Sequence, residues 1–112
     1  MSRAALILSL IASLLFTFGG VFMKLSNGFV RLGPGFAALA LFVAGATAQT
    51  YALRYGELGV AYVFVLGLEA ILAFSFGALF FRESVSLPKL VGVALIVSGF
   101  ALLHAGASFG TR

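Results

Sequence analysis

The side chain with the clearest chemical potential is the carboxylate of Glu69, which lies in the middle of the apolar run at residues 63–77. A charged side chain inside a bilayer is costly, so it must face a protein interior, pair with another group or carry a proton. A carboxylate held in this way can exchange a proton for a cation, because either one neutralises it. The structural alternative is a permanently protonated glutamic acid that bonds to a neighbouring helix. We favour the exchange function.

Other side chains are spaced so that they can share a site with Glu69. Successive residues of a helix turn by about 100°, so Tyr62 lies two turns away on nearly the same line and Phe76 lies on the same face. A second polar stripe recurs at helical spacing earlier in the chain, at Ser9, Ser13, Thr17 and Gly20. These groups can converge on one cavity. For any single Ser or Thr, however, a hydrogen bond to its own helix is the commoner arrangement.

The composition places the whole chain in a membrane. Of its 112 residues, 62% are hydrophobic and 9% are charged, and the mean hydropathy is +1.20. Soluble domains have about 25% charged residues. A chain this short cannot hide so much apolar surface in its own core. We therefore expect an all-α integral membrane protein in which residues 1–112 form a single domain.

The residue types present argue against several other functions. The sequence contains no cysteine and one histidine, His104, so it offers no thiolate or histidine cluster for a metal, and we expect no cofactor. No nucleophile or phosphate-binding motif is visible, so we do not expect an enzyme. The net charge of +4 is explained by basic residues that flank hydrophobic spans, so nucleic-acid binding is not expected either.

Charged residues divide the chain into four apolar segments of about 20 residues, the length that crosses a bilayer. Because backbone polar groups in lipid must be satisfied within the segment, we predict helices at residues 4–23, 35–53, 58–81 and 87–106. Short turns at 27–35, 54–59 and 82–89 require neighbouring helices to run antiparallel. In the last turn, Ser86 and Pro88 are placed as an N-cap and a first-turn proline.

The basic residues barely bias the orientation of this bundle in the membrane. One side of the membrane is expected to carry three basic residues, Arg3, Arg54 and Arg112. The other side is expected to carry four, Lys24, Arg31, Arg82 and Lys89. Loops richer in lysine and arginine normally stay in the cytoplasm, and this near-tie scarcely decides between the two sides. Either the tie is an accident of a small number of charges, or the protein inserts in both orientations.

Four helices enclose too little space for a sizeable polar site, so we expect a second copy to complete it. The last predicted helix carries Gly92 and Gly99 two turns apart. Small residues at helical spacing let two helices approach closely. We therefore place a dimer contact at these glycines, which gives an eight-helix assembly. Loose packing of this helix within its own chain is the simpler alternative.

Three runs make the chain resemble the small multidrug resistance family, within the broader drug/metabolite transporter group. They are MKLSNGFVRLGPG at 23–35, GVAYVFVLGLEA at 59–70 and FFRESVSLPKLVGVALIVSGFALL at 80–103. They are similar to the family's first loop, its third helix, and its third loop with the fourth helix. The resemblance implies a multi-pass protein of the bacterial inner membrane, of dual topology, that forms an antiparallel homodimer around its substrate. It also implies that Tyr62 lines the substrate site.

The chain departs from the family's pattern at the group that binds protons. Drug exporters of the family carry a glutamate on the first helix, about two turns before the lysine of the first loop, and Phe16 stands at that position here. Val65 stands where they usually carry a tryptophan, and Glu69 stands where they usually carry a small residue. We infer that the acidic group has moved from the first helix to the third. The competing inference is that proton-coupled drug export has been lost.

The leading interpretation is a proton-coupled exporter of lipophilic organic cations. Glu69 from both copies would bind either protons or one cation, and aromatic walls would attract the cation through their ring faces. The expected site consists of Glu69, Tyr62, Phe16, Phe76, Ser13 and Thr17.

One alternative is a lipid-handling protein. Some four-helix relatives help to move polyprenyl-phosphate sugars across the membrane, and the run RESVS at 82–86 weakly resembles a turn that they share. Another is the partner subunit of a heterodimeric transporter. The expected partners are a second copy, protons, a small organic cation and membrane lipid.

Overall fold

The computed structural model describes residues 3–108 as helices joined by short connections. The helices are α1 (Arg3–Ser26), α2 (Leu32–Ala52), α3 (Leu58–Phe80) and α4 (Leu87–Ser108), and a single turn of 3-10 helix, η1 (Leu53–Tyr55), extends α2. Within the described residues, these give four segments long and apolar enough to cross a membrane. The prediction of an all-α protein with four spans is confirmed. Arg112, which was expected to add to the charge of one membrane face, lies outside the described residues.

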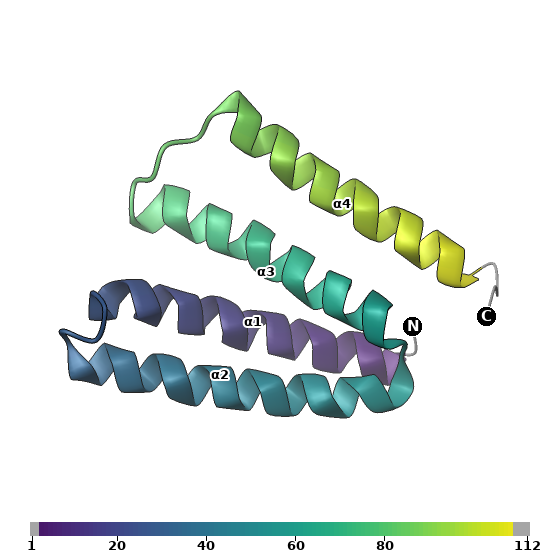
Figure 1. The fold of residues 1–112 in the computed structure, drawn as a ribbon, viewed down its shortest axis with the longest axis horizontal. Helices are drawn as coiled ribbons and strands as arrows, with labels where there is room; N and C mark the ends of the chain where they lie inside the picture. The colour runs from purple at the N-terminus through teal and green to yellow at the C-terminus, as the bar shows by residue number, and fades with distance from the viewer. Residues whose placement is uncertain (1–2, 109–112) are drawn as a thin grey trace.

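The helices lie side by side in the order α2, α1, α3, α4 (Figure 1). α1 and α2 form an antiparallel hairpin, α3 lies against the other side of α1, and α4 contacts α3 at the outer edge. The extents of 48 × 34 × 17 Å describe a thin slab, one to two helix diameters thick. Such a slab has two broad faces, and this helix order leaves no central space enclosed on all sides.

The hairpin of α1 and α2 is held by aromatic rings that pack on glycines. A Cβ added at Gly45 of α2 would lie 2.9 Å from the ring of Phe16, and one added at Gly19 of α1 would lie 3.1 Å from the ring of Phe42. The two rings also contact each other, with centroids 5.6 Å apart. Glycine at each contact leaves room for the ring of the other helix, so the two helices can pack closely in lipid.

The connection between α1 and α2 is shorter than the turn predicted at residues 27–35, because α2 already begins at Leu32. Pro34 lies in the first turn of α2, where a missing N–H costs nothing since that N–H has no helical partner. Asn27, Gly28 and Phe29 adopt left-handed φ angles of 51°, 68° and 69°, which reverse the chain. The prediction that the turn extends to residue 35 is therefore wrong.

The start of α4 agrees with the sequence prediction, and the rest of the helix is peripheral. The N–H of Lys89 donates to Ser86 Oγ at 3.4 Å, so Ser86 is the N-cap, and Pro88 lies in the first turn. None of residues 87–106 is buried. Most of the surface of this long apolar helix therefore faces outward.

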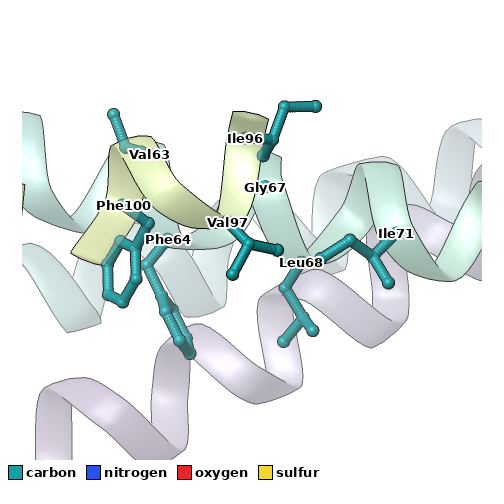
Figure 2. A pocket seen from close by; sticks show the side chains of 8 residues that line it. All are labelled: Val63, Phe64, Gly67, Leu68, Ile71, Ile96, Val97 and Phe100. Atoms are coloured by element: carbon teal, nitrogen blue, oxygen red, sulfur yellow. The ribbon is translucent and has the colours of Figure 1, made fainter. Parts of the chain in front are cut away.

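An apolar groove of about 150 Å³ lies between α3 and α4 (Figure 2). The rings of Phe64 and Phe100 meet at one end, with centroids 5.1 Å apart. Ile96 reaches the α3 backbone at Gly67, where an added Cβ would lie 3.1 Å from it. All the side chains labelled in Figure 2 are hydrocarbon, so this groove offers no polar group to a ligand.

Candidate functional site

The contact between α1 and α3 fixes the depth of Glu69 in the bundle. These two helices run parallel, and Ser13 Oγ of α1 lies 3.5 Å from the carbonyl oxygen of Val65 in α3. Both helices rise by about 1.5 Å per residue, so residues four positions further along each helix lie at the same level. Thr17 and Glu69 are therefore at the same depth. Phe16, at the family position of the missing glutamate, is within one residue of that depth.

Glu69 also lies toward the face of α3 that meets α1. Val65 is fully buried at this interface, and Glu69, four residues later, is displaced from it by about 40° around the helix. Its side chain is partly buried. Within residues 3–108 the carboxylate has no hydrogen-bond or ion-pair partner, and no three metal-ligating side chains gather there or elsewhere. An unpaired carboxylate at this depth must bind a proton or a cation to become neutral.

The hydroxyl groups of the polar stripe on α1 are buried, and two of the three bond to their own helix. Ser9, Ser13 and Thr17 are almost fully inaccessible. Ser13 Oγ donates to the Ser9 carbonyl oxygen at 2.8 Å, and Thr17 Oγ1 donates to the Ser13 carbonyl oxygen at 2.7 Å. This is the ordinary arrangement of hydroxyls in membrane helices. The Ser13 and Thr17 oxygens can still accept a hydrogen bond, but their protons are already used. The buried Ser9 Oγ has no hydrogen-bond partner among the described residues.

A cavity of about 210 Å³ begins beside Thr17 and runs between α1 and α3 to the connection between α3 and α4. Ala73 and Phe76 line it on the α3 side, one and two turns beyond Glu69 on the same face. The ring of Phe76 is held between those of Phe18 and Phe80, at centroid distances of 5.7 and 5.3 Å. Thr17 and Phe76 are thus brought together on one cavity. Glu69 and Ser13 do not line it, and Glu69 lies one helical turn before Ala73.

Two of the predicted site residues lie elsewhere in the single chain. The ring of Phe16 is packed on α2, against Phe42 and Gly45, and not on α3. The side chain of Tyr62 is 44% exposed and lies about two turns from Glu69, toward the end of the bundle that carries Arg3. Neither residue lines the cavity between α1 and α3.

Gly92 and Gly99, the predicted dimer contacts, lie open on α4. A Cβ added at either position would meet no atom within 4 Å, and Gly99 is exposed. Their backbones are therefore accessible to another helix.

The sequence analysis did not anticipate the ion pair at the end of the cavity. Lys24 Nζ, at the end of α1, lies 3.0 Å from Glu83 Oε2 in the connection between α3 and α4. Lys24 Nζ also lies 5.4 Å from the centroid of the Phe81 ring. The only signal in the sequence was that both charges belong to connections predicted on the same side of the membrane.

Comparison with known proteins agrees with this architecture. Residues 4–96 match the Small Multidrug Resistance protein family. The chain is 33% identical over 93 residues to the guanidinium exporter of Citrobacter freundii, covering 83% of this chain and 89% of that one. It is 31% identical over 87 residues to multidrug resistance protein EbrB of Bacillus atrophaeus, covering 78% and 74%. It is 34% identical over 86 residues to the uncharacterized membrane protein YvaE of Bacillus subtilis (strain 168), covering 77% and 72%.

The chain therefore belongs to the small multidrug resistance family. It is a multi-pass membrane protein with four candidate spans among its described residues, and its family consists of transporters of bacterial membranes and not of enzymes.

Proposed function

We propose that this transporter exports small organic cations in exchange for protons, with Glu69 as the group that binds both. The observation that carries the proposal is the register of α1 and α3, which puts Glu69 at the depth of Thr17 and Phe16. The carboxylate has changed helix relative to the family's drug exporters but has kept its level in the bilayer. The names of two relatives, a guanidinium exporter and a multidrug resistance protein, support a cationic substrate.

The coupling follows from the cost of a bare carboxylate in an apolar span. Empty and ionised, Glu69 is penalised by its surroundings, so the stable states carry either a proton or a cation. Only one of the two neutralises the group at a time, so binding a cation expels a proton. A pH gradient can then drive the cation out of the cell.

We further propose that the functional unit is an antiparallel homodimer. The thin slab of helices, the open glycines of α4 and the partly buried Glu69 all leave room for a second copy. Two Glu69 carboxylates facing each other strengthen the exchange, because two close negative charges do not persist without a proton or a cation. In this dimer we expect the exposed Tyr62 to join the site, whereas the ring of Phe16 stays packed on Phe42 and Gly45.

The decisive experiment is proton release on substrate binding by the purified full-length protein in detergent, with guanidinium and tetraphenylphosphonium as probes. The ionised fraction of Glu69 rises with pH, and a cation binds the ionised form, so wild-type affinity should rise with pH and binding should release protons. Glu69→Gln keeps the shape and cannot ionise, so it should abolish both effects. Glu69→Asp should retain both with a shifted midpoint.

Glu57→Gln is the matched control, because Glu57 is an exposed carboxylate at the opposite end of α3 from the cavity. It should release protons like the wild type. If wild-type binding does not change between about pH 5 and 9, or survives Glu69→Gln unchanged, Glu69 is structural. A lipid-handling function or a role as the partner subunit of a heterodimer would then be the better explanation.

A further inference from the structure

The connection between α3 and α4 holds Glu83 in a defined position. The N–H groups of Phe81 and Glu83 both donate to the carbonyl oxygen of Gly77, at 3.1 and 3.0 Å. Between them Arg82 adopts a left-handed φ of 54°, which turns the chain back over the end of α3. The Glu83 carboxylate then lies directly on Gly77, where an added Cβ would collide with Oε1. Backbone hydrogen bonds and a glycine surface thus place this carboxylate.

The Lys24 ammonium makes the contacts of a bound organic cation. It lies 3.0 Å from the Glu83 carboxylate and 5.4 Å from the centroid of Phe81. A carboxylate and an aromatic face are the two groups that proteins most often offer to ammonium and guanidinium ions. The Lys24 and Glu83 side chains are 54% and 48% exposed, so the pair is screened by solvent and weakly held. The ammonium can therefore be exchanged for another cation.

Open space adjoins this pair. The cavity of about 210 Å³ is lined by both Lys24 and Glu83, by Phe81, and further in by Phe76 and Thr17. A cation that replaces the ammonium therefore has room on the protein side of the pair and aromatic rings beside it. Gly77, which supports Glu83, is eight residues beyond Glu69, or about 12 Å along the helix, so the two carboxylates serve separate positions.

We propose that Glu83 and Phe81 form a second cation site, in which the Lys24 ammonium is a tethered occupant that a guanidinium or small alkylammonium ion displaces. Lys24 acts as a competitor built into the chain, since only a cation that binds better than the lysine occupies the site. A planar guanidinium can bind the carboxylate with two hydrogen bonds and lie against a ring, which an ammonium cannot do. The displaced Lys24 side chain moves into solvent.

The test uses full-length protein that carries Glu69→Gln, so that the central carboxylate does not contribute. Binding of radiolabelled guanidinium is measured by equilibrium dialysis. We expect residual binding in this background, loss of that binding when Glu83→Gln is added, and binding about fivefold tighter when Lys24→Met is added instead, because the competing ion pair is removed. Adding Phe81→Leu should weaken binding several-fold. Methylammonium should bind at the same site more weakly.

Glu57→Gln in the same background is the matched control and should leave guanidinium binding unchanged, and thermal unfolding checks that every variant is folded. The proposal is overturned if adding Glu83→Gln to Glu69→Gln does not reduce the residual guanidinium binding. It is also overturned if adding Lys24→Met does not increase the affinity for guanidinium. Because these comparisons are made without the Glu69 carboxylate, that result leaves the role of Glu69 untouched. Conversely, guanidinium binding that depends on Glu83 alone supports the second site even if Glu69 has no role in coupling.

Discussion

The three carboxylates of this chain occupy three different environments, which makes their roles separable by single substitutions. Glu57 is exposed where α3 begins, Glu83 is paired with Lys24 where α3 ends, and Glu69 lies between them without a partner among the described residues. A pair exposed to solvent contributes at most about 1 kcal/mol, whereas an ionised group inside an apolar span costs more than that. This difference is why we propose proton exchange at Glu69 and reversible cation pairing at Glu83.

Tyr62 tests whether an aromatic residue away from the cavity contributes to the substrate site. In the proposed dimer its hydroxyl would hydrogen-bond to a bound cation or to the Glu69 of the second copy, but it would not supply the titrating group. Tyr62→Phe should therefore weaken cation binding by about fivefold, the value of one hydrogen bond, while the rise of affinity with pH remains. Binding measured at several pH values checks this. Loss of the pH dependence in this variant would assign the coupling to a network and not to Glu69 alone.

At the scale of elements, the interface between α1 and α2 is the best-packed part of the molecule and fixes the helix that carries Thr17. Gly45→Val places a branched side chain where the ring of Phe16 now lies. Overpacking of this kind should destabilise the protein by about 1–3 kcal/mol. The midpoint of thermal unfolding in detergent measures the effect.

Gly33→Ala is the matched control for that substitution. Gly33 lies in the first turn of α2, and an added Cβ there meets no atom within 4 Å. Its unfolding midpoint should stay at or slightly above that of the wild type, because alanine favours the helix. If Gly33→Ala and Gly45→Val lower the unfolding midpoint equally, α2 tolerates no side chain at either glycine. The contact with Phe16 is then not the cause of the destabilisation.

The elements were predictable from the sequence because lipid leaves few choices. Apolar segments between charges must be helices, and Ser86 with Pro88 marks the start of α4 by local chemistry alone. Pro34 misled the prediction, because the same residue that breaks a helix interior is tolerated in a first turn.

The site was less predictable, because it depends on which helix faces which. Periodicity placed Tyr62 in line with Glu69, but it does not say that the ring of Phe16 turns to α2. The pairing of Lys24 with Glu83 requires the ends of α1 and α3 to meet, and a single sequence carries no information on that contact beyond the sign of the two charges.

At the scale of the whole molecule, the near-equal charge of the two ends predicts insertion in both orientations. A tag at the carboxyl terminus should be accessible on both sides of the membrane in intact cells. Val30→Lys with Val85→Lys adds charge to the connections at one end, at two exposed positions. This pair of substitutions should fix one orientation, with that end in the cytoplasm, and should reduce transport. A tag found on one side only in the wild type would rule out an antiparallel homodimer.

The open surface of α4 predicts where the two copies of the proposed dimer meet. Gly99→Leu fills an exposed glycine that now allows close approach, so it should shift the protein from dimer to monomer in chemical crosslinking. Ala44→Leu, at an exposed position of α2, adds similar bulk away from α4 and should leave the crosslinking yield unchanged. Equal yields for both variants would place the contact on another surface.

The peripheral position of α4 would also make the proposed dimer open to inhibition. Residues 87–106 include no buried side chain, so this helix keeps its shape through its own backbone hydrogen bonds and not through the rest of the chain. A synthetic peptide with the sequence of α4 would present the same glycines to an unpaired copy and compete with the second chain for them. An antagonist of this kind would not resemble a substrate. The transporter would therefore be blocked without competition for its substrate site.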